Sequence, residues 1–417
     1  MKRILRVGCI GLGSRGRGLM KKLIQMQPSK VVGLFDLKQP CIDQALEDCK
    51  ALGETRVKVY PSAQAMFDDK NVDAVVIATS WAAHIPLATA AMKAGKAVGL
   101  EVGPAMSIED LFTLVDVCEK TNGRLMFLEN ACFGRDELLA INLIKEGVLG
   151  EIVHAVGGYQ HEVADLVYKE FKNMNTENAG NERILNRINR NMEPYPTHGI
   201  GPVAKALGIN RGNRFISLNS VSSKAVGLKA YIERTDGKEA AYDFPRLAQG
   251  DVITTMLKCA RGETVVLTWN TVLPAPASRL LKFHGTNGMI NLEKGSIYVN
   301  GVNEKGKWAN KDDYKDKYKH PAFKWFDRNK YQEKLGLKPG SHADMDFITL
   351  FAFVDCTLKE YDYPIDVYDA ATWMAISVLA EQSLALGSAP VFFPDFTNGK
   401  WMRRGELKID ERWDCGV

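Results

Sequence analysis

Residues 193–202, EPYPTHGIGP, bring together side chains that can perform acid–base chemistry. Tyr195, Thr197 and His198 supply a phenol, a hydroxyl and an imidazole between two prolines. Because the ordinary pKa of an imidazole is close to neutrality, His198 is the candidate general acid or base. The apolar residues that follow have the spacing of an amphipathic helix, at Ile200, Val203, Ala204 and Leu207. We therefore expect the three reactive side chains at the start of a helix.

A second group of residues has the spacing of a dinucleotide-binding loop. The segment GLGSRG at residues 11–16 follows an apolar run, and Asp36 ends the next apolar run. Glycines let the backbone approach a pyrophosphate, which binds at the N-terminus of the helix that follows. The carboxylate of Asp36 can accept hydrogen bonds from a ribose and would repel a 2′-phosphate, so we expect NAD rather than NADP. The predicted loop residues are Gly11, Gly13, Ser14, Arg15 and Gly16.

Polar or aromatic side chains also follow three later apolar runs, in the segments ATSWAAH, LEVG and LEN. Ligands of open α/β sheets bind outside the carboxyl ends of the strands, so these residues are candidates for cofactor contacts. They are Trp81, His84, Glu101 and Asn130. Two alternatives stay open: Trp81 could pack in the core, and His84 could cap the start of a helix.

Hydrophobic periodicity predicts the elements that position these residues. Up to about residue 130, short runs rich in Val, Ile and Leu alternate with helical patterns closed by glycine. This pattern is typical of a parallel sheet covered by helices on both faces. We therefore expect an α/β fold whose N-terminal domain, residues 1–130, is a Rossmann doubly wound parallel sheet that binds NAD.

The remaining residues, 131–417, have a different pattern. Apolar and polar residues alternate over longer runs, and segments 251–272 and 280–301 contain the turn signals of hairpins. Two helical patterns follow at 343–360 and 367–387. We expect a C-terminal, substrate-binding α+β domain with an open, mostly antiparallel sheet and helices on one face. Its last helices could pack on the first domain.

Composition limits the classes of function. The chain of 417 residues is 46% hydrophobic and 25% charged, with a formal net charge of +4 and no apolar run near the length of a membrane span. Acids are interleaved with the lysines of segment 304–320, so this segment, which contains His320, is expected to be a solvated loop rather than a nucleic-acid patch. No CxxC pair or metal-ligand spacing occurs, so no metal is expected. Without a recognisable signal peptide, the expected location is the cytoplasm.

The sequence resembles the Gfo/Idh/MocA oxidoreductases and, more closely, glycoside hydrolase family 109, the NAD-dependent α-N-acetylgalactosaminidases. Similar stretches run nearly from end to end, and they include GLGSRG, SWAAH, LEVGPA, YPTHGIGP and VYDAATWMAISVLAEQSLALG. The resemblance implies a small glycan or glycoside as substrate, and NAD that is tightly bound and not consumed. The NAD contacts that it implies are Arg15, Gly16, Asp36, Ser80, Trp81, His84, Glu101, Val102, Asn130 and Tyr195. The implied sugar pocket contains Tyr159, Arg183, Tyr195, Pro196, Thr197 and His198.

The implied reaction is a glycosidase reaction without the usual pair of carboxylates. Oxidation of the sugar at C3 makes the C2 proton acidic, a base removes that proton, and the aglycone is eliminated. Water then adds and C3 is reduced again, so NAD is recycled. His198, Tyr195 and Tyr159 are the candidate catalytic residues, and Arg183 is a cation that could lower the pKa of a tyrosine. Which residue takes which proton stays open.

Departures from the family pattern leave alternatives. The oxidoreductases carry a lysine at the position where this chain has Val102, and the glycosidases of family 109 also lack this lysine. In addition, this chain has Ala277 where the pattern of family 109 has a tyrosine. The second interpretation is therefore a NAD-dependent sugar oxidoreductase that releases NADH, and a third is a cofactor-holding protein without turnover. His342 is a further candidate at the edge of the sugar site. Relatives with this sheet often pair through its exposed face, so we expect a homo-oligomer.

Overall fold

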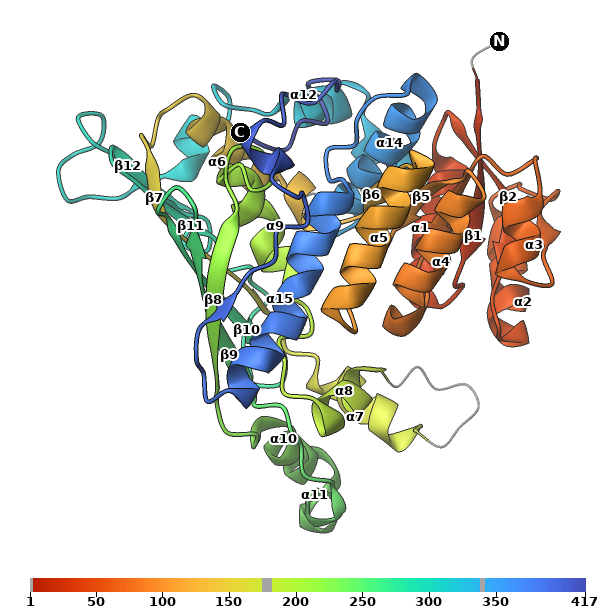
Figure 1. Ribbon diagram of the computed structural model, residues 1–417, viewed down its shortest axis with the longest axis horizontal. Coiled ribbons are helices and arrows are strands. Elements are labelled where there is room, and N and C mark those ends of the chain that lie inside the picture. Colours follow the sequence, from red (N-terminus) through yellow and green to blue (C-terminus); the bar gives the residue numbers. More distant parts are fainter. Residues whose placement is uncertain (1–2, 175–181, 338–341) are drawn as a thin grey trace. The chain divides into compact units, whose positions relative to one another are not determined.

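The computed structural model describes residues 3–174, 182–337 and 342–417, and the side chain of His342 lies outside the described part. The chain divides into two compact units (Figure 1). Unit 1 contains residues 1–139, 319–372 and 405–416, and unit 2 contains residues 140–318, 373–404 and 417. Two of the boundaries between the units fall within helices, α6 (Arg135–Lys145) and α15 (Val367–Ala385), and the others fall after residues 318, 404 and 416.

Unit 1 is built on six parallel strands in the order β3-β2-β1-β4-β5-β6. The strands are β1 (Leu5–Ile10), β2 (Ser29–Phe35), β3 (Lys58–Val59), β4 (Ala74–Ile77), β5 (Ala97–Leu100) and β6 (Leu125–Phe127). Both faces of β4, β5 and β6 are buried, which explains why continuous apolar runs predicted them. The strand order reverses between β1 and β4, as in the Rossmann fold, so the predicted fold of this region is confirmed.

Helices cover the parallel sheet in two layers. They are α1 (Ser14–Gln25), α2 (Gln39–Ala51), α3 (Ala63–Asp68), α4 (Trp81–Lys93), α5 (Ile108–Thr121) and α14 (His342–Lys359). Helix α1 packs against α2 and α14, whereas α4 packs against α3 and α5 (Figure 1). Helix α14 also contacts the 3-10 helix η1 (Asn130–Phe133), so a distant part of the sequence completes this unit.

The predicted solvation of His320 is wrong. Unit 1 also contains α12 (Pro321–Arg328) and α13 (Tyr331–Leu335), and His320 is the buried N-cap of α12. Its Nδ1 atom accepts a hydrogen bond from the Ala322 N–H, and its Nε2 atom lies 2.9 Å from the Asp414 carbonyl oxygen. The imidazole is buried because it caps a helix and pairs with a distant segment, which the charge pattern around it does not reveal.

Unit 2 contains a nine-stranded sheet in the order β14-β13-β12-β11-β7-β10-β9-β8-β15. Its strands are β7 (Ile152–Gln160), β8 (Phe215–Ser222), β9 (Val252–Cys259), β10 (Thr264–Asn270), β11 (Lys282–Gly285), β12 (Gly288–Asn291), β13 (Ser296–Val299), β14 (Ala309–Asn310) and β15 (Val391–Phe392). The central pair β7 and β10 is parallel, and the other neighbours are antiparallel. The mostly antiparallel sheet and both hairpins are therefore as predicted.

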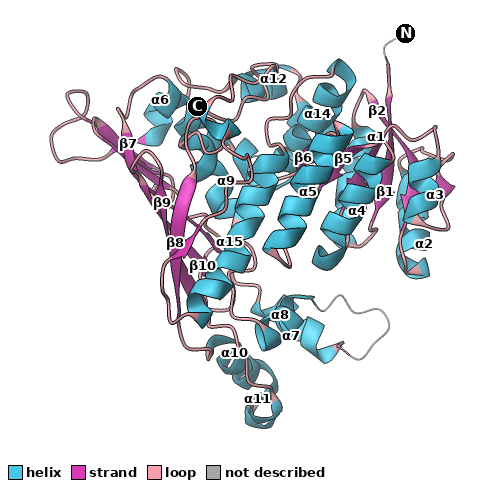
Figure 2. Cartoon of the chain, in the orientation of Figure 1, coloured by secondary structure: helices cyan, strands magenta, loops and turns pink. Residues whose placement is uncertain are grey.

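Helices of unit 2 lie on one face of this sheet. Helix α9 (Thr197–Ala206) packs on β7 and β10, and Ser383 of α15 bonds the backbone of β8 (Figure 2). A separate helical cluster has its own apolar core. It contains α7 (Ala164–Lys172), α8 (Glu182–Asn189), α10 (Gly227–Asp236) and α11 (Lys238–Asp243). The 3-10 helices η2 (Lys311–Tyr314) and η3 (Lys400–Met402) complete the unit.

Candidate active site

The three glycines of the loop after β1 have three different surroundings. Gly11 has a φ of +84°, and a Cβ atom there would lie 2.4 Å from the Ala78 carbonyl oxygen. A Cβ atom on Gly16 would lie 1.8 Å from the Gly11 oxygen, whereas a Cβ atom on Gly13 would meet nothing within 4 Å. The first glycine therefore allows the turn, the third allows helix α1 to approach, and the second leaves open space in which a pyrophosphate can reach the backbone.

Asp36 holds this loop from the end of the neighbouring strand. Its carboxylate accepts hydrogen bonds from the Leu12 N–H at 2.6 Å and from the Lys38 N–H at 2.9 Å. The two bonds fall on different oxygens, so each oxygen keeps a lone pair for a further donor. The side chain is half-buried at the point where a ribose hydroxyl is expected in this fold.

Arg15 forms a charged network within unit 1. Its guanidinium Nε atom lies 3.0 Å from Oε1 of Glu101, and its Nη1 atom lies 2.7 Å from Oδ2 of Asp346. Asn130 donates to the same Asp346 carboxylate at 2.7 Å. Burial alone would raise the pKa of Asp346, but the hydrogen bond and charge of Arg15 outweigh burial and lower it. Burial raises the pKa of Glu101 in spite of the same guanidinium.

Asp346 was missed in the sequence because it lies in the apolar pattern of α14, far along the chain from the glycine loop. An acidic residue on such a helix is usually interpreted as part of its solvated face. Its side chain is nevertheless buried between Arg15 and Asn130. The network brings together three of the predicted cofactor residues, and Asp346 fixes the direction of the Arg15 guanidinium.

The residues after β4 lie at the start of helix α4. Ser80 is the N-cap residue, and Trp81 begins the helix with its indole against Gly103, where a Cβ atom would come within 2.5 Å of the ring. His84 is buried, with Nε2 at 3.2 Å from the Thr79 carbonyl oxygen, and burial lowers its pKa to about 4. The imidazole is therefore neutral, and within the described part of the chain its buried Nδ1 atom has no hydrogen-bond partner.

In unit 2, three aromatic side chains meet where β7 ends and α9 begins. The ring centroid of Tyr159 lies 5.2 Å from that of Tyr195 and 5.3 Å from that of His198, and the Tyr195 and His198 centroids are 4.9 Å apart. His198 and the adjacent Thr197 are buried. The Thr197 hydroxyl has no hydrogen-bond partner among the described residues. Residues predicted from the sequence to form the sugar pocket are thus brought together.

Close approach of helix α9 to strand β7 positions this cluster. A Cβ atom on Gly199 would lie 2.4 Å from the Gly158 backbone nitrogen, and one on Gly157 would lie 2.6 Å from the Gly199 oxygen. Gly157 and Gly199 therefore let the strand and helix backbones touch, which side chains of ordinary size would prevent. His198 precedes Gly199 directly, so this contact sets its distance from Tyr159.

Two further polar groups border the aromatic cluster. Arg183 of α8 has its guanidinium carbon 5.9 Å from the Tyr195 ring centroid and its Nε atom 3.8 Å from a carboxylate oxygen of Glu170. His161, just beyond β7, lies with Nδ1 at 3.1 Å from the Tyr159 hydroxyl. Arg183 can stabilise a negative charge on Tyr195, and His161 can exchange a proton with Tyr159.

A buried acid lies next to the cluster in sequence. Glu193 is fully buried, accepts a hydrogen bond from the Thr255 hydroxyl at 3.2 Å, and has its pKa raised by burial to about 8. Arg187 of helix α8 is also buried, packs over the Trp269 ring with its guanidinium carbon at 4.6 Å, and has its pKa lowered by burial to about 9. The sequence offered no sign that either of these two ionisable groups is buried.

Across the part of the chain that the structure describes, no three His, Cys, Asp or Glu side chains gather as metal ligands, and no helix is long and apolar enough to cross a membrane.

Two known families match this chain, one over each half. Residues 133–403 match the family described as "Glycosyl hydrolase 109, C-terminal domain". The chain belongs to glycosyl hydrolase family 109. Residues 5–128 match the family described as "Oxidoreductase family, NAD-binding Rossmann fold". This matched segment contains the glycine loop and Asp36. The resemblance inferred from the sequence is therefore confirmed.

Two curated members of the family are α-N-acetylgalactosaminidases. The one from Tannerella forsythia is 36% identical over 418 residues, covering 96% of this chain and 88% of that protein. The one from Shewanella oneidensis is 32% identical over 423 residues, covering 97% of this chain and 88% of that protein. The similarity therefore includes both units.

Solved structures share the fold at low sequence identity. Myo-inositol dehydrogenase from Lactobacillus casei, in complex with NAD(H) and myo-inositol, has a TM-score of 0.61 at 14% identity, over 96% of this chain and 100% of that one. Levoglucosan dehydrogenase, in complex with NADH and L-sorbose, has a TM-score of 0.65 at 18% identity, over 94% and 100%. Family 109 members and these dehydrogenases thus have a common architecture.

Proposed function

We propose that this family 109 member removes an α-linked N-acetylhexosamine from a small glycan or glycoside by a redox-elimination mechanism that recycles tightly bound NAD. The aromatic cluster of Tyr159, Tyr195 and His198 carries this proposal. Most glycosidases use two carboxylates, but the residues of the predicted sugar pocket offer phenols, an imidazole and a guanidinium instead. The phenols and the imidazole suit proton transfer at C–H and O–H bonds, and the guanidinium can stabilise the negative charge that this transfer leaves.

The described residues of unit 1 fit a bound dinucleotide. Gly13 faces open space, the Asp36 oxygens can each accept another hydrogen bond, and the buried Nδ1 atom of His84 has an unused lone pair. When bound, NAD would supply a hydride acceptor for the oxidation of sugar C3 and a hydride donor for its later reduction. In this proposal unit 1 holds the cofactor and unit 2 supplies the proton-transfer groups.

His198 is the proposed base for the C3 hydroxyl, for C2, or for both in turn. Once C3 carries a carbonyl, loss of the C2 proton allows the electrons of that C–H bond to form a double bond and expel the aglycone from C1. Tyr159 or Tyr195 is the second proton-transfer group, since Arg183 lies close enough to the Tyr195 ring to favour its phenolate. Water then adds at C1, and a proton returns to C2.

A second candidate function is net sugar oxidation with release of NADH. The residue that follows Glu101 is the buried aliphatic Val102, so the lysine that assists hydride transfer in the oxidoreductases is missing. This substitution argues against the second function. Ala277 favours a substrate different from that of the relatives that carry a tyrosine at this position. Its neighbour Ser278 pairs with Gln160, and Gln160 directly follows Tyr159, so Ala277 lies close in the sheet to the predicted sugar pocket.

The deciding experiment is incubation of the purified protein with a panel of aryl α- and β-glycosides in D₂O, followed by measurement of aglycone release, sugar deuteration and NADH. Release with deuterium at C2 and no net NADH would support redox elimination and would identify the sugar. Release without deuterium at C2 would contradict the mechanism but leave a glycosidase. Slow formation of NADH from free sugars without aglycone release would favour the oxidoreductase.

We also propose that the protein is a homo-oligomer that pairs through the open face of the unit 2 sheet. Leu267 and Thr255 pair across β10 and β9 and are both buried on the face that helix α9 covers at β10, so their strand neighbours Val266 and Met256 point to the other face. On that face Met256 is 51% exposed and Val221 is 55% exposed. Apolar side chains in such a row are typical of a surface that a partner covers.

A further inference from the structure

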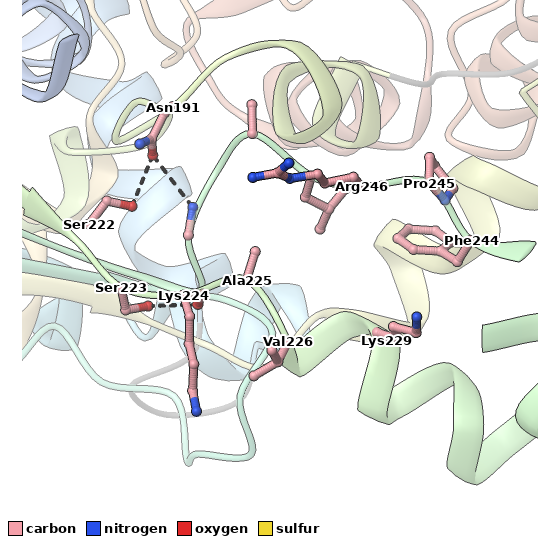
Figure 3. Close-up of a pocket in the computed structure, with 13 residues that line it drawn as sticks. Asn191, Ser222, Ser223, Lys224, Ala225, Val226, Lys229, Phe244, Pro245 and Arg246 are labelled. Atoms are coloured by element: carbon pink, nitrogen blue, oxygen red, sulfur yellow. Dashed lines mark hydrogen bonds between the residues drawn. The ribbon is translucent and has the colours of Figure 1, made fainter. Parts of the chain in front are cut away.

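A pocket of about 560 Å³ lies in unit 2, outside the residues assigned to the cofactor and the sugar (Figure 3). The end of β8, the start of α10, and the loop between α11 and β9 form its walls. This volume falls in the range of sites for small molecules. No residue of the pocket belongs to the predicted active site, so its chemistry needs a separate explanation.

Three cationic side chains line this pocket: Lys224, Lys229 and Arg246. In Figure 3, Arg246 extends from the loop of Pro245 toward the end where Asn191 and Ser222 lie, and Lys229 stands on helix α10. No acidic side chain is among the described residues that line the pocket. Like charges that share one pocket repel each other, and a bound anion would relieve this repulsion.

The charge of these three side chains is not balanced by ion pairs. Elsewhere in unit 2, Arg190 pairs with Glu381 and Arg214 pairs with Asp395. Within the described part of the chain, Lys224, Lys229 and Arg246 form no such pair. The carboxylate of Asp251, which follows the last residue of the pocket wall, is buried and accepts hydrogen bonds from the backbone N–H groups of Val226 and Gly227, so it is bound to the start of helix α10.

The two ends of the pocket differ in polarity. At one end Asn191 accepts hydrogen bonds from the Ser222 hydroxyl at 2.9 Å and from the Gly250 N–H at 3.4 Å, which fixes a polar wall. At the other end Phe244 is buried in the apolar core of the helical cluster and presents an edge to the pocket. A ligand that fits both ends carries an anionic group on a body of about monosaccharide size.

We propose that this pocket binds a small organic anion, in which a phosphate, sulfate or carboxylate group meets Arg246 and the two lysines add to the positive charge of the walls. The proposal is independent of the glycosidase reaction, because it concerns residues that take no part in it. A charge-assisted hydrogen bond is stronger than a neutral one, so loss of one cation should weaken binding by about tenfold.

The test is calorimetric titration of the protein saturated with NAD, so that the glycine loop cannot take up the probe. The probes are glucose 6-phosphate, glucuronate, inorganic phosphate and uncharged glucose. We expect both acidic sugars to bind more tightly than glucose, with an affinity that falls as ionic strength rises. Equal affinity for inorganic phosphate and glucose 6-phosphate would also support the anion site and would identify a free anion as its ligand.

Variants separate this pocket from the rest of the surface. Arg246→Ala should weaken binding of the best anion about tenfold, and a variant that also carries Lys229→Ala should abolish it within the measured range. The control is Lys305→Ala, which removes an exposed lysine of the same unit outside the pocket. Because all three side chains are exposed, the melting temperature should hardly change, and aglycone release from aryl glycosides should persist. Equal binding of glucose and the anions, no anion binding, or an equal loss in Lys305→Ala would overturn the proposal.

Discussion

At the scale of single residues, His198 is the most direct test of the proposed chemistry. Replacement by Gln keeps a side chain of similar size against Tyr159 and Tyr195 but removes the titratable ring. General acid–base groups typically contribute a factor of about 10² to 10⁴, so kcat for aryl glycosides should fall by about that factor. NAD binding should stay unchanged, because His198 is not among the predicted NAD contacts and the glycine loop is left intact. Steady-state kinetics and NAD titration measure the two quantities.

The matched control for this substitution is His161→Gln. His161 is exposed and reaches the cluster through a hydrogen bond to the Tyr159 hydroxyl, so its loss should lower kcat much less. If His198→Gln retained full activity, its role as a base would be disproved. An equal loss of activity in both variants would mean that the proton passes through Tyr159.

Asp36 determines the expected preference for NAD. Asp36→Asn replaces one carboxylate oxygen by an NH₂ group, which cannot accept a hydrogen bond from either Leu12 or Lys38. The loop loses one of its two anchors and the ribose loses an acceptor, so the Kd for NAD should rise by about tenfold or more. Repulsion of a 2′-phosphate also disappears, so the ratio of NADP to NAD affinity should increase. Titration with both cofactors checks this, with the exposed Asp43→Asn as control.

At the scale of elements, the contact between α9 and β7 is expected to control activity. Gly199→Ala would place a Cβ atom 2.4 Å from the Gly158 nitrogen, and backbone atoms cannot move aside as a flexible side chain can. The helix must shift away from the strand, which should destabilise unit 2 by about 1–3 kcal/mol and move His198 from Tyr159. We expect a lower melting temperature together with a lower kcat.

Gly18→Ala is the control for this helical glycine, because a Cβ atom at Gly18 meets nothing within 4 Å in helix α1. Alanine is the better helix former, so this variant should be neutral or more stable by about 0.5–1 kcal/mol. A Gly199→Ala variant as stable and active as Gly18→Ala would show that the contact does not position His198.

The sequence predicted those elements of the fold whose pattern lies within one short segment, and it missed those that depend on contacts between distant segments. Strands β1 to β6 other than β3, helices α4, α5, α14 and α15, and the two hairpins of unit 2 have strong local periodicity, and the structure has them. Edge strand β3 is two exposed residues and has no such pattern. The helices around α10 were not predicted, because they are short and bury their apolar faces mainly against one another.

The same reasoning applies to the candidate site. The glycine loop, Asp36 and the YPTH segment are local motifs, so they were found, although their roles stay predictions. Asp346 and the partner of His320 come from distant segments, and one sequence contains no signal that pairs them. The glycines at 157 and 199 were visible in the sequence, but their function in a helix–strand contact depends on tertiary structure.

At the scale of the whole molecule, the open face of the unit 2 sheet predicts association. Met256→Lys places a charge among the exposed apolar residues of that face, and buried charges without partners are unfavourable. Light scattering should then give a smaller particle than for the unmodified protein. Lys305→Ala, far from this row in sequence, should leave the mass unchanged. A monomeric unmodified protein, or an oligomer insensitive to Met256→Lys, would refute this interface.

Stability of the whole chain should depend on pH through Glu193. Its pKa is about 8 in the folded protein, whereas the ordinary value is 4.5. Between pH 4.5 and about pH 8, the folded state therefore keeps a proton that the unfolded state has lost. This stabilisation is fully present below about pH 4.5 and is lost as pH rises through about 8. Glu193→Gln keeps a neutral group beside Thr255, so it should remove this loss and make the protein more stable than the unmodified chain at pH 9, by an amount on the order of a few kcal/mol. Urea unfolding at pH 5, 7 and 9 measures the difference, with the exposed Glu293→Gln as control. Parallel pH profiles for the unmodified and Glu193→Gln proteins would mean that the carboxyl ionises without cost, and that water or a cation reaches it inside unit 2.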